Sequence, residues 1–187
     1  MRPSQDGPAP IPSAPARPAG GVYLGLGSNL GDRAVNLAAG LAGLEDRGAV
    51  TVRRSRIYRT DPVGGPPQGE FLNLVVEVET ALGPAALLAA ALEVERGRGR
   101  RREEEVRWGP RTLDIDILLF RGRVLSRPGL ELPHPRLHLR RFVLAPLAEL
   151  APDLRHPRSG RTIAALLAAC EDSGAVRPET PAPGTVA

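Results

Sequence analysis

One run of alternating residues, Phe71 to Thr80, most limits what this chain can fold into. Leu72, Leu74, Val76 and Val78 fall on one face of an extended strand, because successive side chains point to opposite sides. We therefore expect the even positions to face a core and the odd positions to turn away from it. A strand with one apolar face must be covered by another layer of structure.

The segments around this strand alternate between strand and helix patterns. Their order is strand, helix, strand, strand, helix, strand, which is typical of the ferredoxin-like βαββαβ arrangement. The sequence thus predicts an α+β fold in which helices cover one face of an antiparallel sheet and the other face is open for a site. The expected elements are a strand over 22–26 running into a glycine turn, a helix from Asp32, an extended run over 50–59, the strand over 71–80, a helix from Pro84, a strand over 113–120, and additional C-terminal helices near 140–150 and 162–170.

Proline and glycine set the limits of the folded unit. The 187 residues include 20 Pro and 21 Gly, well above average usage, and prolines crowd the first 20 positions. Such a composition does not bury enough apolar surface to offset the entropy of ordering. We expect a disordered leader over 1–20, one folded domain over 21–172 and a disordered tail over 173–187.

The residue types that are absent exclude several kinds of chemistry. All 25 basic residues are arginine, so a P-loop lysine, a kinase strand lysine and a Schiff-base amine are excluded. Cys170 is the only cysteine, which excludes an intrachain disulfide and a multi-cysteine metal site. No secretory h-region follows Met1 and no apolar run approaches about 18 residues, so we expect a cytoplasmic protein that makes no membrane contact.

Two acidic residues stand two positions apart in the strand expected over 113–120. Asp114 and Asp116 therefore project from the same face, with their Cα atoms about 7 Å apart. Paired carboxylates with no cysteine nearby suit Mg²⁺ shared with substrate phosphates better than they suit zinc. For the pair alone, a solvated strand face is an equal alternative.

Arginines crowd both sides of this acidic pair. A planar guanidinium binds phosphate through two parallel hydrogen bonds, so the cluster favours a polyphosphate held with its metal. For any single arginine, a solvated loop paired with the neighbouring glutamates over 103–105 is the simpler interpretation. The basic residues are Arg98, Arg100, Arg101, Arg102, Arg107 and Arg111 before the pair, and His134, Arg136, His138, Arg140 and Arg141 after it.

Three other motifs have weaker interpretations. The glycines over 25–31 are not a dinucleotide fingerprint, because Leu30 occupies the place of the third glycine. His134 and His138 have the spacing of a helical zinc pair, but prolines on both sides of His134 exclude a helix there. His134 is therefore either a phosphate donor or a plain loop histidine. Trp108 either packs in a core or clamps a planar or cationic group.

Arg107 to Leu118, which reads RWGPRTLDIDIL, closely resembles the signature of the 6-hydroxymethyl-7,8-dihydropterin pyrophosphokinases, enzymes of folate biosynthesis. Other motifs follow in the order that this family shows, and together they span nearly the whole expected domain. They are GLGSNLG over 25–31, YRT over 58–60, FLN over 71–73, GRGR over 97–100, PHPR over 133–136, and then Arg140 and Phe142.

The resemblance implies a reaction and a set of site residues. The hydroxymethyl oxygen of the pterin would attack the β-phosphorus of ATP, which transfers pyrophosphate and releases AMP. Two Mg²⁺ ions would be held by Asp114 and Asp116, and Trp108 with the arginine loop would form a lid. The implied catalytic residues are Arg98, Arg100, Arg111, Asp114 and Asp116; the ATP site is Glu93, Arg98, Arg111, Ile117, Glu131, His134 and Arg140; the pterin site is Thr60, Pro62, Val63, Phe71, Asn73, Trp108, Asp114 and Phe142.

Two other classes of function fit the sequence less well than this enzyme. Ferredoxin-like sheets also bind RNA, but they stack bases on paired strand aromatics, and this chain offers only Phe71. A glycoside hydrolase built on two carboxylates leaves the arginines unexplained. We therefore expect ATP and the hydroxymethyl pterin as partners of a monomer that binds no nucleic acid.

Overall fold

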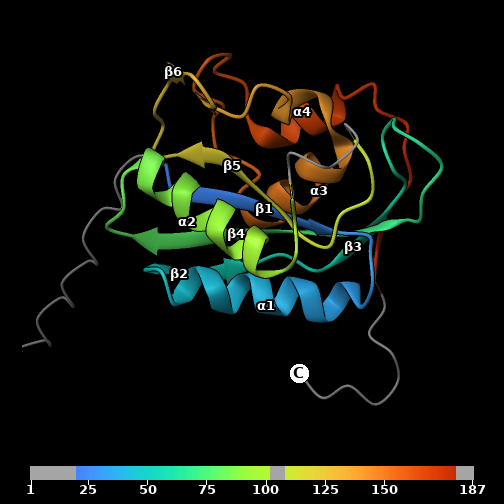
Figure 1. Cartoon of the computed structure of the whole chain (residues 1–187). Helices are drawn as coiled ribbons and strands as arrows, with labels where there is room; N and C mark the ends of the chain where they lie inside the picture. The colour runs from blue at the N-terminus through green and yellow to red at the C-terminus, as the bar shows by residue number, and fades with distance from the viewer. Residues whose placement is uncertain (1–19, 102–107, 180–187) are drawn as a thin grey trace, which may run out of the picture.

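A computed structural model describes residues 20–101 and 108–179, and Figure 1 shows how their helices and strands are arranged. The first half contains β1 (Val22–Ser28), α1 (Arg33–Glu45), β2 (Ala49–Arg54), β3 (Tyr58–Thr60), β4 (Phe71–Thr80) and α2 (Pro84–Gly97). The second half contains β5 (Asp114–Phe120), β6 (Leu125–Arg127), β7 (Leu130–Leu132), a 3-10 turn η1 (Leu137–Leu139), α3 (Arg141–Leu150), α4 (Ile163–Ala168) and β8 (Val176–Pro178).

Within the described residues, neighbouring strands of the main sheet pair antiparallel, in the order β5-β1-β4-β3-β8, with β2 also paired to β4. The short strands β6 and β7 form a separate hairpin. Helices α1 and α2 lie side by side along one side of the sheet, and α3 and α4 lie on the other side (Figure 1). The predicted α+β architecture is confirmed, and β1 and β4 occupy its centre.

Local sequence signals explain where the helices begin. The Asp32 carboxylate accepts a hydrogen bond from the Val35 amide at 3.0 Å and caps α1. Pro84 stands at the first position of α2, where its missing N–H costs nothing. Thr162 caps α4 by accepting from the Ala165 amide at 3.2 Å. These helix starts agree with the sequence prediction.

The larger core lies between the sheet and the first two helices. The even positions of β4 (Leu72, Leu74, Val76 and Val78) are buried there, as their alternation predicts. They pack with apolar side chains of α1 and α2 and with Ile115 and Ile117 of β5. Burial of this apolar surface is the main stabilising contribution to the fold.

The odd face of β4 is also buried, which differs from the expectation that it is open. Val75 is 1% exposed and packs with Tyr23, Leu118 and the apolar sides of α3 and α4 in a second core. The C-terminal helices cover this half of the face because their own apolar sides need a partner layer. Only the half of the face toward Asn73 and Asp114 is available for a site.

Two expected boundaries within the sheet were wrong. The run predicted over 50–59 is divided into β2 and β3, and Ser55 lies between them with its hydroxyl accepting from the Val75 amide at 3.0 Å. The glycine turn expected after residue 26 begins later, because Gly27 and Ser28 still belong to β1. The chain turns only at Gly31, whose φ of +61° is a conformation that suits glycine.

The C-terminal boundary also differs from the prediction. Residues 176–178 form β8, an ordered edge strand paired with β3, within the tail expected to be disordered from residue 173. Short pairing of this kind has little hydrophobic signature, so composition alone did not indicate it. The leader expected over 1–20 lies outside the described residues except for Gly20.

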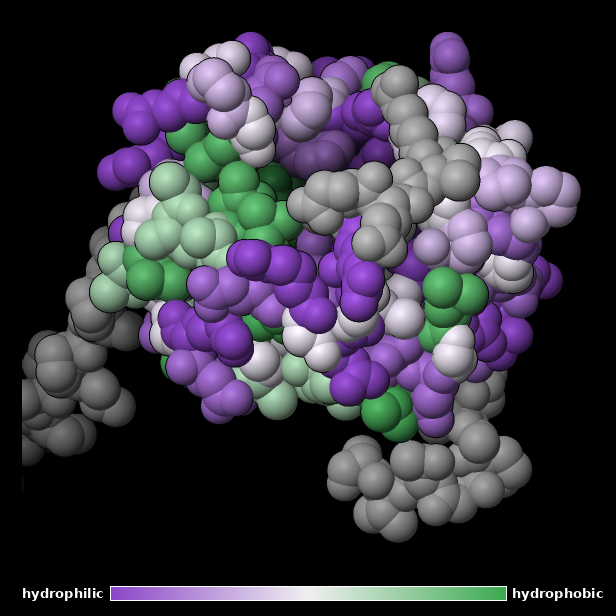
Figure 2. Space-filling model, viewed as in Figure 1, coloured by the Kyte–Doolittle hydropathy of each residue, from purple (hydrophilic) through white to green (hydrophobic). Residues whose placement is uncertain are grey.

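Hydrophilic side chains predominate on the face shown in Figure 2, and a hydrophobic area lies over α2. Exposed or partly exposed alanine and leucine residues of α2 make up part of that area. Within residues 20–101 and 108–179, no helix is both long enough and apolar enough to cross a bilayer.

Candidate active site

The floor of the site is a row of residues that run across three strands. On β1, Gly27 pairs with Asn73 of β4 on one side and with Asp114 of β5 on the other. Gly25 similarly pairs with Val75 and with Asp116. Because the two glycines of β1 have no side chain, the Asn73 amide of β4 and the two carboxylates of β5 face the same space.

The space at Gly27 has no room for a side chain. A Cβ atom built at this position would lie 2.5 Å from the Asn73 amide oxygen, a distance that real Cβ atoms do not show. The glycine therefore lets Asn73 lie over the β1 backbone. This is the physical use of a motif that sequence reasoning assigned to a turn.

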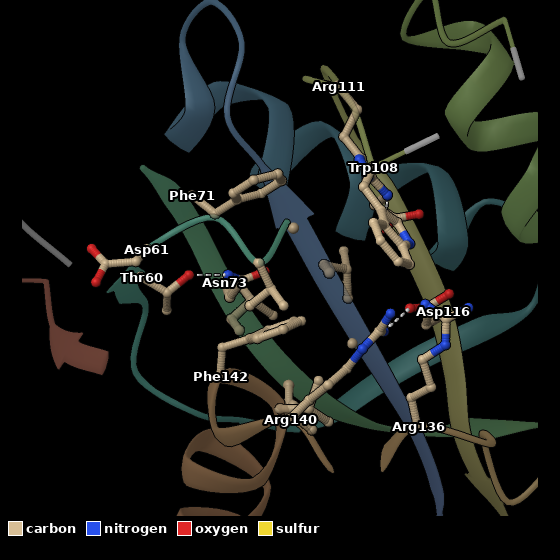
Figure 3. A pocket seen from close by; sticks show the side chains of 18 of the residues that line it. Thr60, Asp61, Phe71, Asn73, Trp108, Arg111, Asp116, Arg136, Arg140 and Phe142 are labelled. Atoms are coloured by element: carbon tan, nitrogen blue, oxygen red, sulfur yellow. Dashed lines mark hydrogen bonds and ion pairs between the residues drawn. The ribbon is translucent and has the colours of Figure 1, made fainter. Parts of the chain in front are cut away.

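A cavity of about 530 Å³ stands on this floor, a size that suits a small-molecule site. Figure 3 shows its side chains projecting from β4, β5, α3 and two loops toward the same space. Its lining includes Gly25, Gly27, Thr60, Asp61, Val63, Gly64, Gln68, Phe71, Asn73, Trp108, Arg111, Asp114, Asp116, Arg136, Leu139, Arg140 and Phe142.

One end of the cavity is aromatic and carries an amide. Phe71 and Phe142 approach from opposite sides with Asn73 between them (Figure 3). The Asn73 side-chain Nδ2 donates to Thr60 Oγ1 at 2.7 Å, and both residues are buried. This bond fixes the orientation of the amide, so the end of the cavity suits a flat ring with hydrogen-bonding edges.

The other end carries the acidic pair, which is surrounded by arginines. Asp114 accepts from Arg111 Nη1 at 2.7 Å and also from Arg100 Nη1. The Arg100 guanidinium is only 6% exposed and is also paired with Glu95 Oε1 at 2.8 Å. Glu95 in turn accepts from the Ile115 amide at 2.7 Å, which ties α2 to β5 directly beneath the acids.

Asp116 faces two basic side chains at longer range. Its Oδ2 lies 3.6 Å from Arg140 Nη1 and 3.7 Å from His134 Nε2. Burial, together with the charges of Arg140 and Arg136, lowers the pKa of His134 to about 4, so its ring is neutral at pH 7. Because Nδ1 accepts from the Arg136 amide at 3.1 Å, the proton of the neutral ring is assigned to Nε2, which points toward Asp116.

Arginines stack on the cavity's aromatic rings. The guanidinium carbons of Arg111 and Arg140 lie 5.8 and 5.5 Å from the ring centres of Phe71 and Phe142. Arg136 lies 5.4 Å from the ring centre of Trp108. These cation–π contacts hold the three guanidinium groups at the cavity, and those of Arg111 and Arg140 also pair with Asp114 and Asp116.

Two loops meet over the cavity at Trp108. The Trp108 ring packs against Gly64, and its carbonyl oxygen accepts from Gln68 Nε2 at 2.8 Å. Asn29 joins both loops, since its Nδ2 donates to Gln68 Oε1 at 2.9 Å and its Oδ1 accepts from the Arg111 amide at 2.7 Å. Trp108 itself has a φ of +62°, a strained conformation for a residue other than glycine.

The structure brings together many of the residues implied by the resemblance. Arg100 and His134 are not in the lining but contact the acids directly, as described above. The implied residues that line the cavity are Thr60, Val63, Phe71, Asn73, Trp108, Arg111, Asp114, Asp116, Arg140 and Phe142.

Seven of the implied residues lie outside that cavity lining: Arg100 and His134, and five others. Glu93 is half exposed and pairs with Arg47 at 3.2 Å, and Glu131 pairs with Arg158 at 3.1 Å. Ile117 is buried in the larger core. The other two are Arg98, which donates to Asn36 Oδ1 at 2.6 Å, and Pro62, which lies in the loop after β3. Arg102 and Arg107 of the predicted cluster, and most of the predicted lid, lie outside the described residues.

Sequence reasoning missed Glu95 and Asn29 as parts of the site, and it named Arg136 only as a member of the basic cluster. A signal for Glu95 was present, because Leu87, Ala91 and Glu95 are spaced by four and so share one face of a helix. An acid on the apolar face of a helix needs a buried partner. No comparable signal marked Asn29, whose contacts are with residues 39 or more positions away.

The carboxylates of Asp114 and Asp116 fit a divalent cation bound together with phosphate. Both are oxygen ligands on the same side of β5, and their side chains are 22% and 33% exposed toward the cavity. The arginines beside them can bind the phosphate groups that would accompany the metal. The residues 20–101 and 108–179 contain no cluster of three or more His, Cys, Asp or Glu side chains that could bind a metal alone.

Comparisons with known proteins agree with this site. The family model described as 7,8-dihydro-6-hydroxymethylpterin-pyrophosphokinase (HPPK) matches residues 23–152. The 2-amino-4-hydroxy-6-hydroxymethyldihydropteridine pyrophosphokinase of Bacillus subtilis is 51% identical over 130 residues, which are 69% of this chain and 77% of that protein. The protein of the same name from Methylorubrum extorquens is 46% identical over 159 residues, 84% of this chain and 98% of that protein.

Solved structures show the same fold. The Plasmodium falciparum HPPK-DHPS wild type with SDX-DHP has a TM-score of 0.59 to this chain at 17% identity, over 79% of this chain. The chain spans only 43% of the length of that protein. Fold, site and relatives together define a pyrophosphokinase. The chain belongs to the 7,8-dihydro-6-hydroxymethylpterin-pyrophosphokinase family.

Proposed function

We propose that the cavity over β1 is the place where this chain transfers pyrophosphate from ATP to 6-hydroxymethyl-7,8-dihydropterin, a step of folate biosynthesis. One observation carries the proposal. Asn73 and the acids Asp114 and Asp116 face a single space across the two glycines of β1. A ring held at Asn73 therefore presents its substituent toward the acids and the arginines.

The pterin occupies the aromatic end in this proposal. Its flat ring lies between Phe71 and Phe142, and its polar edge meets the Asn73 amide that Thr60 orients. An amide offers a donor and an acceptor side by side, which matches the alternating donors and acceptors of a pterin edge. Burial of Asn73 makes an unmatched ring costly to bind, because a buried polar group without a partner is destabilising.

The triphosphate occupies the charged end. Arg111 and Arg140 line the cavity there, and His134 lies beside Asp116 as a neutral hydrogen-bond donor. Asp114 and Asp116 would hold Mg²⁺ here, and the resemblance to the family implies two such ions. When bound, Mg²⁺ neutralises charge on the phosphate oxygens.

Catalysis by this chain then consists mainly of positioning. Transfer of a phosphoryl-type group needs the attacking oxygen, the phosphorus and the leaving oxygen in line, and it needs the charge on the phosphate oxygens to be neutralised. The guanidinium groups are held by the acids and by aromatic rings before substrate arrives, so little reorganisation is needed. Closure of Trp108 against the loop at Gly64 would exclude water and suppress hydrolysis of ATP.

Product analysis tests the proposal. The chain is incubated with ATP, Mg²⁺ and the hydroxymethyl pterin, and AMP rather than ADP is expected. Asp116→Ala is expected to keep the fold and abolish the product, because it removes one of the two carboxylates at the phosphate end. Asp153→Ala, on the exposed turn after α3, is the matched control and is expected to retain activity. AMP release by the Asp116 variant at a near-normal rate would overturn the site assignment.

Binding measurements separate the enzyme from the RNA-binding alternative. Binding of ATP that requires Mg²⁺ favours the enzyme, whereas binding of RNA that weakens with salt and needs no Mg²⁺ favours the alternative. A monomeric state, a cytoplasmic location and a lack of nucleic-acid binding remain predictions of the sequence.

A further inference from the structure

The C-terminal strand β8 contacts the segment that forms one wall of the aromatic end. It pairs antiparallel with β3, with Thr60 opposite Val176 and Arg59 opposite Arg177. Strand β3 is only three residues long and is otherwise paired on one side with β4. Strand β3, which carries Thr60, the partner of Asn73, therefore lies between β4 and β8. The red end of the ribbon runs beside β3 in Figure 1.

The contacts of β8 continue past both ends of the strand. The Asp61 amide donates to the Ala175 carbonyl at 3.2 Å, and the Ala175 amide donates to the Asp61 carboxylate at 3.0 Å. The Glu179 amide donates to the Ile57 carbonyl at 2.7 Å. Asp61 is the first residue of the loop over 61–70, so the entrance of this loop is fixed by the C-terminal segment.

The exit of the same loop is fixed by charged side chains. Glu70, its last residue, accepts from Arg177 Nη2 at 3.0 Å and from Arg59 Nη1 at 3.2 Å. Arg59 also binds Glu179 through two hydrogen bonds of 2.8 and 2.5 Å. Phe71, which lines the cavity, follows Glu70 directly. The two ends of the loop thus share one anchor, β8.

This anchor matters because of the composition of the loop. Residues 61–70 include three prolines and three glycines and form no helix or strand, so the loop has few internal contacts to fix its path. Val63, Gly64 and Gln68 of the loop line the cavity. The paired side chains are 27% to 63% exposed, so each ion pair contributes little to global stability. Their effect is on where the loop lies.

We propose that β8, together with Ala175 and Glu179, is a positioning element for the pterin end of the site. It holds Thr60 and the loop over 61–70 in the conformation that receives the ring. The assignment of that ring to this end rests on the proposed function. The segment lies beyond the residues 23–152 that the family model matches, and the acids of β5 lie on the far side of β1 and β4 from β8.

The test uses three full-length variants at two positions. Because Asp61 and Ile57 bond to residues 175 and 179, the pair Arg59–Arg177 is the hydrogen-bonded pair between them. Arg177→Pro removes the backbone donor of that pair. Arg177→Lys keeps the donor and the charge and is the matched control. Glu179→Gln removes one of the two counter-charges of Arg59, because Glu70 also pairs with Arg59, and it is mild enough to leave the fold intact.

The readout is a comparison of the KM for the pterin with the KM for ATP in each variant. Arg177→Pro is expected to raise the KM for the pterin about tenfold or more and to change the KM for ATP less than twofold. Glu179→Gln is expected to raise the pterin KM about threefold, and Arg177→Lys to stay within twofold of the unmodified chain for both substrates. If Arg177→Pro does not fold, the result for Glu179→Gln decides the matter alone.

Two outcomes contradict the proposal. Equal effects on pterin and ATP in the folded variants would show that β8 serves general stability, and an unchanged pterin KM in both Arg177→Pro and Glu179→Gln would show that it positions nothing. The unmodified chain is assayed first. If it releases no AMP from ATP and the pterin, the proposed function fails; if it does and the variants keep the pterin KM, only the role of β8 fails.

Discussion

Replacement of the buried Glu95 by glutamine should destabilise the protein far more than the same change at Glu93, two residues earlier on α2. Glu95 is 1% exposed and accepts hydrogen bonds from the Arg100 guanidinium and the Ile115 amide. The side chain of Glu93 is 55% exposed and pairs with Arg47 at 3.2 Å. The two variants have the same chemistry and lie on the same helix, so they differ in burial and in partners.

The expected magnitude follows from those contacts. Removing one partner of a buried ion pair costs about 3–5 kcal/mol because the other charge is left uncompensated. Asp114 still pairs with Arg100, which reduces the loss, so we expect Glu95→Gln to lower the free energy of unfolding by about 2–4 kcal/mol. For the exposed pair of Glu93 we expect a loss below about 1 kcal/mol. A domain with about 5–15 kcal/mol of stability remains folded in both cases.

Urea unfolding at pH 7 measures this difference. The midpoint for Glu95→Gln is expected to fall with an unchanged slope, since the surface exposed on unfolding stays the same. AMP formation by Glu95→Gln is also expected to fall, because Arg100 loses the carboxylate that holds it beside Asp114. Equal losses of stability in the Glu95 and Glu93 variants would refute the argument that Glu95 is the buried anchor of the site.

Three further predictions concern the cavity floor, the loop contact and the pH dependence. Gly27→Ala is expected to raise the pterin KM more than tenfold, because its Cβ would lie 2.5 Å from the amide oxygen of Asn73; an unchanged KM in steady-state assays would contradict the proposed floor. Gly65→Ala is expected to loosen the contact with Trp108, since Gly65 has a φ of +79° and its Cβ would meet the Trp108 carbonyl; emission of the single tryptophan should shift to longer wavelength, and an unshifted spectrum would argue against the contact. Burial and two basic neighbours hold the pKa of His156 below its ordinary value of 6.5, so the unfolded chain takes up the proton first and stability should decline as the pH falls below 6.5; His156→Gln should flatten this decline between pH 7 and 5, and an unaltered pH profile of the unfolding midpoint would contradict it.

The parts of the fold that sequence reasoning predicted are those coded by local patterns. The alternation over 71–80 predicts β4 because one face of that strand packs against a continuous apolar core. Asp32 and Pro84 predict where α1 and α2 begin, because a capping residue and a first-turn proline affect only the few residues next to them. The pairing of Asp114 and Asp116 on one face likewise follows from the geometry of a single strand.

The errors fall where a contact between distant segments decides the structure. Composition gave no reason to expect β8, because this strand is held by its pairing with β3 and by ion pairs of Arg177 and Glu179 with residues more than 100 positions earlier. The predicted open face of β4 is half covered because α3 and α4 bring their own apolar sides to it. Such contacts depend on which surfaces remain uncovered after the other elements have packed.

The active site combines both kinds of information. Residue types and their spacing determined by themselves that acids, arginines and a glycine-containing strand occur in this chain, because each motif is short and contiguous. Only the tertiary structure decided that Gly27 lies between Asn73 and Asp114, that Glu95 anchors Arg100, and that the C-terminal strand borders the loop of the cavity. Strand pairing and burial join residues regardless of their separation along the chain, and for that reason local patterns do not encode these contacts.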